Sequence, residues 1–210
     1  GNDTDPEDLA FAELLRDGLG RDVEVLRLGG FPAMPQGFRE MLETNTFITH
    51  QKHLAWVYAH RYGAEKNLVH LRSNISEIGR EFWRGKNVEV GSGKDLARLY
   101  LQRDREYPAA YVFRVITLFE EFDRVTGLSA CRGRVDLKSL FYWEFRMASW
   151  HAQLVAESDP AFETLSLFNC RAALEAMLSV PRADRAGGSV LRRVISENWP
   201  ELAEYPVNGK

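Results

Sequence analysis

The sequence predicts an α/β fold in its first part, followed by a mostly helical second part. Short alternating segments that favour strands occur only before residue 72, and each is followed by a helical pattern. From about residue 92 onward, the apolar residues recur at helical spacing. A strand–helix–strand–helix order is typical of a parallel sheet with crossover helices. We therefore expect a partial Rossmann-like parallel sheet over residues 1–86 and a helical C-terminal domain over residues 87–210.

The composition is that of a globular protein rather than a disordered or fibrous one. Of its 210 residues, 45% are hydrophobic and 27% are charged. The net charge of −3 argues against a dedicated duplex-DNA binder, and no apolar run approaches the ~18–20 residues of a membrane span. No signal peptide opens the chain, and two cysteines, Cys131 and Cys170, are typical of a reduced compartment. We expect a cytoplasmic protein without nucleic-acid or membrane partners.

The first 63 residues predict one helix, one strand and two further helices. Asp5 is placed to cap a helix, Pro6 suits its first position, and Gly20 ends it. The alternation over residues 23–28 predicts a short strand. Residues 34–63 carry helical patterns, which we interpret as two pieces.

A second strand is predicted over residues 68–71, before the polar loop that starts at Arg72. Its apolar members Val69 and Leu71 are expected to be buried. Two parallel strands alone make a poor sheet, because parallel sheets are normally covered on both faces within larger sets. The N-terminal part therefore looks incomplete.

The remaining chain predicts a succession of helices. Ser92 is placed to cap the first of them, and Gly127 is placed to end a strongly amphipathic one. The expected helices cover a segment from residue 92, then 108–126, 136–157, a segment from 169 to Pro181 and one from 189 to Pro200, with an extended tail after that. The expected core comprises Leu15, Val25, Leu54, Val69, Leu71, Val115, Phe119, Leu140, Phe141, Phe145, Leu174 and Leu178.

Glu144 lies on the apolar side of the helix expected over 136–157. A buried carboxylate needs a partner, such as His151, Arg146 or Arg171, because an unpaired buried charge is very costly. A structural ion pair is the favoured interpretation over a catalytic acid. No metal site is assigned: His50 and His53 have the spacing of metal ligands on a helix but no evident further ligand, and Cys131 and Cys170 are isolated.

The loop after the second predicted strand is the candidate site. Ligands of α/β sheets bind at the carboxyl ends of strands, where helix N-termini offer free backbone N–H groups. Ser73, Asn74 and Ser76 add short polar side chains, Glu77 is placed to hold Mg²⁺ or orient a nucleophile, and Arg80 follows one turn later. A plain capped helix explains the same residues equally well.

The chain resembles the synthetase domain of asparagine synthetase-like proteins. These belong to the PP-loop ATP pyrophosphatases, in the adenine nucleotide alpha-hydrolase superfamily. The resemblance rests on the element order, on Ser-Asn-Ile-Ser-Glu-Ile-Gly-Arg-Glu-Phe (73–82), and on Phe-Tyr-Trp-Glu-Phe-Arg-Met (141–147). It continues in Phe-Asn-Cys-Arg (168–171), Met-Leu-Ser-Val-Pro-Arg (177–182) and Trp-Pro-Glu-Leu (199–202).

The resemblance implies an ATP-dependent, AMP-forming amide ligase that activates a carboxylate as an acyl-adenylate for attack by an amine. It implies ATP and Mg²⁺ as cofactors and small-molecule carboxylate and amine substrates. Glu77 matches the final glutamate of the family loop Gly-x-Gly-Gly-Asp-Glu and is the implied catalytic residue. Ser73, Asn74, Ser76 and Arg80 would meet the nucleotide phosphates, and Arg171, Arg182 and Arg185 would close over them.

The chain departs from the family pattern at the nucleotide site. It has no Ser-Gly-Gly-x-Asp-Ser stretch, and its loop at 73–77 contains neither glycine nor aspartate. We therefore expect ATP and Mg²⁺ only in a complete enzyme and no cofactor in this chain alone. Three hypotheses remain: the C-terminal part of a ligase, an inactive relative that binds a partner or a small anion, and an unrelated helical binding module. A homo-oligomer is compatible with each of them.

Overall fold

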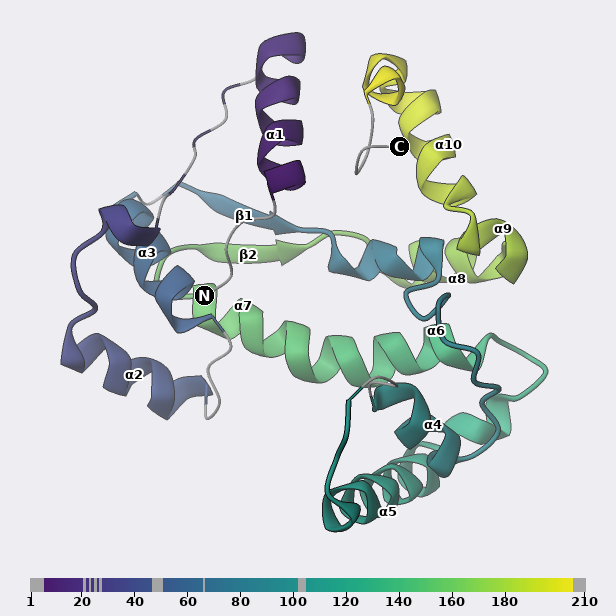
Figure 1. Ribbon diagram of the computed structural model, residues 1–210. Helices are drawn as coiled ribbons and strands as arrows, with labels where there is room; N and C mark the ends of the chain where they lie inside the picture. The colour runs from purple at the N-terminus through teal and green to yellow at the C-terminus, as the bar shows by residue number, and fades with distance from the viewer. Residues whose placement is uncertain are drawn as a thin grey trace.

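The computed structural model describes residues 6–20, 22, 24, 26, 28–46, 51–65, 67–101 and 105–205. Within these ranges the protein is mostly helical, with ten α-helices and a small two-stranded parallel sheet (Figure 1). The predicted combination of a parallel sheet and a helical remainder is thus confirmed in its coarse form. None of the helices in these ranges is long and apolar enough to span a membrane.

The N-terminal helices follow the prediction. Helix α1 covers Pro6–Leu19, and the expected pair over 34–63 is present as α2 (Gln36–Thr46) and α3 (Lys52–Tyr62). The strand expected over 23–28, including Val25 of the expected core, lies largely outside the described residues. Its last residue begins a short 3₁₀ turn, η1 (Leu28–Gly30).

The sheet pairs two segments that are far apart in the sequence. Strand β1 (Val69–Arg72) confirms the strand predicted at 68–71, and its parallel neighbour is β2 (Glu163–Ser166). The prediction of an all-helical chain after residue 92 is therefore wrong at β2. β2 has only four residues, so it gives little signal between the helical patterns that precede and follow it. The domain division at residue 86 stays a prediction, although the sheet takes one strand from each side of it.

One face of the sheet is covered and the other is open. On the covered face, the His70 ring lies 4.8 Å from that of Phe162 and 5.9 Å from that of Tyr58 of α3. On the other face, Val69 and Leu71 are 56% and 57% exposed, so their predicted burial is wrong. Alternation along a strand sends successive side chains to opposite faces, and no described element covers this second face closely enough to bury them.

The sheet continues into a compact helical region. A 3₁₀ helix, η2 (Asn74–Arg80), follows β1, and the helices α4 (Gly93–Tyr100) and α5 (Ala109–Thr126) come next, followed by the turn η3 (Leu128–Cys131). The Ser92 hydroxyl accepts the backbone N–H of Asp95, which confirms the predicted cap. Gly127 ends α5 with a φ of 66°, a conformation that glycine adopts without steric cost.

The expected helix over 136–157 is continuous but changes its geometry midway. It begins as α6 (Leu137–Phe141), passes through a π-helical segment, η4 (Tyr142–His151), and ends as α7 (Ala152–Ser158). In Figure 1 this rod runs beneath the two strands. A π-helix bonds residue i to i+5, so the buried positions Tyr142 and Met147 lie five apart. The predicted burial of Glu144 is wrong, because it assumed α-helical spacing; the side chain is exposed.

The C-terminal end is helical throughout its described part. It comprises α8 (Arg171–Ser179), the short α9 (Arg182–Ala186), α10 (Ser189–Asn198) and the 3₁₀ helix η5 (Pro200–Glu204). The extended tail predicted after residue 200 is wrong over η5, since proline is well tolerated in the first turn of a helix. Helix α9 was not predicted.

The main core lies among η2, α4, α5, α6, η4 and α8. Phe119 of α5 packs edge-on against Phe141, whose ring stacks on Phe145 at 5.0 Å. Of the expected core residues, Val115, Phe119, Phe141 and Leu174 are buried in this cluster, and Leu140, Phe145 and Leu178 pack against it partly buried. Leu15 and Leu54 are half-buried outside it. Most of the predicted helical core is thus confirmed.

Candidate functional site at the ends of the strands

A cavity of about 440 Å³ opens beside the carboxyl ends of the two strands. We call it the strand-end pocket. Its wall combines apolar side chains with a few polar ones, as in most small-molecule sites. The residues used below are Ile75 of η2, Glu144, Met147 and His151 of η4, and Ser166 and Asn169 at and after the end of β2.

The parallel pairing brings these residues together. Arg72, the last residue of β1, lies opposite Ser166, the last residue of β2. The backbone N–H of Leu167 donates to the Arg72 carbonyl at 2.7 Å and extends the pairing by one bond. Both chains then turn away from the sheet, and the π-helical segment supplies the floor through Met147 and His151.

His151 and Arg72 carry hydrogen-bonding atoms without a partner. His151 is 4% exposed, and its Nε2 is buried with no partner among the described residues. The same holds for Nε of the half-buried Arg72. Burial lowers the pKa of His151, and the positive charge of Arg72 lowers it further. Burial also lowers the pKa of Arg72. A buried unpaired donor or acceptor costs about 1–3 kcal/mol, so these two atoms are suited to receive a ligand.

The loop after β2 is held in a strained conformation. Phe168 has a φ of 64°, in the left-handed region that bulky residues rarely adopt. Such a residue costs about 1–3 kcal/mol and is commonest near binding sites. The next residue, Asn169, lines the strand-end pocket.

The predicted loop residues occupy one short segment beside this pocket. The helix that they begin, η2, is a seven-residue 3₁₀ helix, and its N-cap Ser73 makes no side-chain cap bond. The Asn74 carbonyl accepts the Tyr142 hydroxyl at 2.9 Å, and Ser76 donates its backbone N–H to the Ser73 carbonyl. Of this segment, Ile75 is the residue whose side chain lines the pocket.

Glu77 and Arg80 bind each other. Two nitrogens of Arg80, Nε and Nη2, contact the two Glu77 oxygens at 2.8 and 2.6 Å. Burial raises the pKa of the neighbouring Tyr142 hydroxyl, and the Glu77 charge raises it further. The Glu77 carboxylate is therefore occupied within the fold.

The three predicted arginines lie elsewhere. Arg171 is 89% exposed in its side chain and pairs with Glu175 within α8. Arg182 contacts the buried Glu81 at 2.6 Å. Arg185 is 1% exposed and donates to the Ile78 and Val180 carbonyls, which places it at the C-terminal end of η2. The structure does not bring these arginines to the strand ends.

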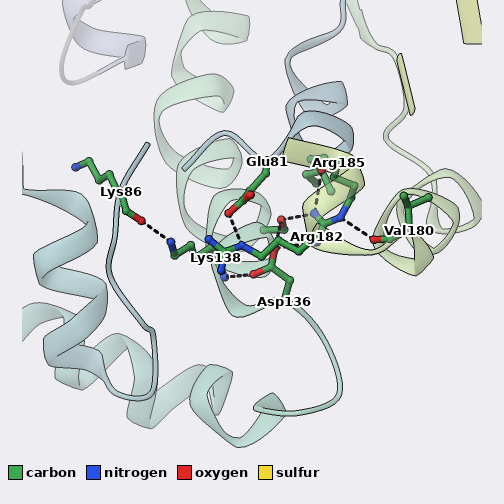
Figure 2. Close-up of polar contacts among 9 residues, drawn as sticks. Glu81, Lys86, Asp136, Lys138, Val180, Arg182 and Arg185 are labelled. Carbon is green, nitrogen blue, oxygen red and sulfur yellow. Dashed lines mark hydrogen bonds and ion pairs between the residues drawn. The ribbon is translucent and has the colours of Figure 1, made fainter. Parts of the chain in front are cut away.

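Arg185 is the centre of a buried network with Asp136 and Ser139, which we call the buried arginine cluster; the separate ion pair of Arg182 and Glu81 lies beside it (Figure 2). The Arg185 guanidinium reaches the Asp136 carboxylate at 2.9 Å and the Ser139 hydroxyl at 2.7 Å. The pKa of Asp136 is lowered: burial alone would raise it, and the hydrogen bonds from Ser139 and Arg185 outweigh that effect. Beside the cluster, Nζ of Lys138 donates to the Lys86 carbonyl at 2.6 Å.

The residues of this chain do not make a complete site for ATP or Mg²⁺. Magnesium takes several oxygen ligands. Across the described ranges, no three His, Cys, Asp or Glu side chains gather in a way that could hold a metal ion. The loop at 72–77 has one carboxylate, Glu77, and no glycine to let backbone approach a phosphate.

Sequence reasoning missed His151, Ser166 and Asn169 as pocket residues. Residues 162–167 contain three apolar residues but do not alternate strictly, so they give only a weak strand signal. Recognising β2 would have directed attention to the residues after it. Glu144 and His151 both line the strand-end pocket, from positions seven residues apart in η4.

Comparisons with family models, with curated proteins and with solved structures found no match for this chain. The resemblance to asparagine synthetase-like proteins stays a prediction.

Proposed function

We propose that this chain is the C-terminal part of an asparagine synthetase-like, AMP-forming amide ligase, and that the strand-end pocket holds its carboxylate substrate. One observation carries the proposal: a cavity lies at the carboxyl ends of two parallel strands and contains the buried, unpartnered Nε2 of His151. Ligands of α/β folds bind at this position.

The pocket residues have suitable chemistry for a carboxylate. Arg72 does not line the pocket; its guanidinium, at the adjacent end of β1, attracts the negative charge from beside it. The pKa of His151 is lowered, which favours the neutral ring, so Nε2 makes a hydrogen bond without adding a charge. Ser166 and Asn169 orient the rest of the substrate. The loop at 72–77 does not fit the nucleotide, so under this proposal other residues hold it.

A second candidate is a small-anion-binding module without catalysis. The bidentate pair between Glu77 and Arg80 favours it, because a carboxylate bound on both oxygens is poorly placed to hold a metal ion. Arg72 and His151 remain available to an anion in either case.

The test is ATP–pyrophosphate exchange by the protein at its natural length, with a panel of amino acids as carboxylate substrates. The ligase proposal predicts exchange that depends on the carboxylate and falls about a hundredfold in Arg72→Gln. The exposed side chain of Arg193 provides the matched control Arg193→Gln, which should keep full exchange.

Two outcomes would contradict the ligase proposal: absence of exchange with every carboxylate, or equal exchange in Arg72→Gln and Arg193→Gln. Absence of exchange together with pyrophosphate binding that Arg72→Gln weakens about tenfold would establish the second candidate instead. Absence of both would leave neither function standing.

A further inference from the structure

A second and larger cavity lies on the other side of the helical region. It measures about 830 Å³, within the range of small-molecule sites. We call it the aromatic cleft. It is lined by side chains from the segment after η2, from the end of α4, from the start of α5 and from η4. Six of them carry the argument: Trp83, Tyr100, Arg105, Tyr107, Tyr111 and Arg146.

The cleft exposes aromatic surface that a monomeric core would normally bury. Tyr100 and Tyr111 are 41% and 42% exposed, and Phe82 on the same wall is 36% exposed. The Tyr107 and Tyr111 rings stack at 5.4 Å with an angle of 17° between their planes. Aromatic faces gathered around one cavity are surfaces on which a planar ligand can stack.

Positive charge surrounds these rings. Arg105 lies 5.5 Å from the Tyr107 ring centre, and Nζ of Lys86 lies 5.2 Å from that of Trp83. Arg146 is stacked between two rings, 4.7 Å from Phe82 and 4.3 Å from Trp150. Among the described residues that line it, the cleft has three basic side chains, Lys86, Arg105 and Arg146, and one acidic side chain, Glu106.

Two buried donors in this wall have no partner. Trp83 is 8% exposed, and its indole N–H makes no hydrogen bond among the described residues. The same is true of Nε of Arg146. Both atoms only donate, so what they lack is an acceptor. A second cavity of about 290 Å³ shares Trp83, Tyr100 and Arg146 with the cleft and extends it past Trp150.

We propose that the aromatic cleft binds a small ligand in which a planar aromatic ring is joined, directly or through a sugar, to an anionic group, and that a nucleoside monophosphate is a ligand of this kind. The ring stacks on the tyrosines at the rim, and the anion lies toward Arg105 and Arg146. The cleft shares no lining residue with the strand-end pocket, so the site is separate from the proposed ligase function.

The test is calorimetric titration of the 210-residue chain with GMP, guanosine and ribose 5-phosphate. GMP should bind, and each of its two halves should bind at least about tenfold more weakly, because one lacks the anion and the other lacks the ring. Tyr111→Ala and Arg105→Gln should each weaken GMP binding about tenfold.

Helix α5 provides matched controls outside the cleft. Phe113 is 73% exposed and Arg114 is exposed, and neither lines the cavity, so Phe113→Ala and Arg114→Gln should keep full GMP affinity. The strand-end variant His151→Gln should keep it as well.

Three results would overturn the proposal. They are absence of GMP binding at low millimolar concentration, equal binding of GMP and guanosine, and equal affinity of Tyr111→Ala and Phe113→Ala for GMP. A loss of GMP binding in His151→Gln but not in Tyr111→Ala would move the ligand to the strand-end pocket and would equally overturn it.

Discussion

The buried arginine cluster and the strand-end pocket are both polar, but they differ in how their hydrogen bonds are completed. In the cluster, Arg185 donates to a carboxylate, a hydroxyl and two carbonyls of the protein itself. At the strand ends, His151 in the pocket wall and Arg72 beside the pocket each retain a buried nitrogen without a partner among the described residues. A polar group whose bonds are closed within the fold stabilises the fold, and one left open is available to a ligand.

This difference separates two kinds of arginine that look alike in the sequence. In the structure both lie near η2: Arg72 precedes it at the end of β1, and Arg185 donates to the Ile78 carbonyl near its C-terminal end. Arg185 joins η2, α6 and α9 through its hydrogen bonds, whereas Arg72 lies at the end of strand β1. Stability measurements should therefore respond to Arg185 and ligand measurements to Arg72.

The largest expected effect is that of Arg185→Met on stability. The change leaves the Asp136 carboxylate, 14% exposed in its side chain, without its charged partner. Removal of one member of a buried ion pair costs about 3–5 kcal/mol. The free energy of unfolding, measured in urea, should fall by that amount. The exposed pair of Arg193 and Glu197 gives the control Arg193→Met, expected within about 0.5 kcal/mol of wild type.

The stabilising contribution of the buried arginine cluster should also depend on pH. The folded-state pKa of Asp136 lies below the ordinary value of 3.8, so its stabilising contribution is present above pH 3.8 and is lost as the pH falls through the depressed folded value. Unfolding free energies measured between pH 5 and pH 2 should decline, and the decline should be shallower in Arg185→Met. An identical slope in the two proteins would show that Asp136 gains nothing from Arg185.

The strand-end pocket should behave in the opposite way. Since Nε2 of His151 makes no bond, His151→Phe removes no partner and should change the free energy of unfolding at pH 7 by less than about 1 kcal/mol. The folded-state pKa of His151 lies below 6.5, so wild-type stability should also fall as the pH drops below 6.5. The stability of His151→Phe should fall less over the same pH range. Part of the fall should remain, because burial also lowers the pKa of His70. If His151→Phe lowered the free energy of unfolding by more than about 3 kcal/mol at pH 7, His151 would instead be needed for the stability of the fold.

The smallest effect is expected at Arg171. Its ion pair with Glu175 is fully solvated, and such pairs contribute about 0–1 kcal/mol. Arg171→Ala should leave thermal unfolding and ATP–pyrophosphate exchange unchanged. A loss of exchange with intact folding would instead return Arg171 to the group of phosphate-contacting residues that the family resemblance implies.

Much of the helical architecture could be predicted because its signals are local. A cap such as Ser92, a terminator such as Gly127 and the apolar spacing of α5 act within a few residues. The failures come from long-range pairing and from unusual helical geometry. Nothing near Val69 indicates that its neighbour is Glu163, and nothing near Glu144 indicates a π-helical register.

The candidate site was predictable only in its location. The rule that ligands bind at the carboxyl ends of parallel strands led to the segment after Arg72, and the strand-end pocket lies beside that segment. The identity of its walls depends on β2 and on the π-helical segment, both of which escape periodicity arguments. Arg185 illustrates the converse, because its burial, which the sequence does not indicate, commits it to the fold; Arg182 is exposed and pairs with the buried Glu81.

The π-helical segment has a consequence for changes in chain length. A π-helix carries more residues per turn than an α-helix, so η4 accommodates length that an α-helix of the same rise would not. Deletion of a single residue between Tyr142 and His151 would favour ordinary α-helical bonding. The loss of one residue and the tighter winding of the α-helix change the helix phase in opposite directions, so they offset each other in part. An insertion has no such compensation, because the segment is already wound more loosely than an α-helix. This stretch should therefore tolerate a one-residue deletion better than a one-residue insertion.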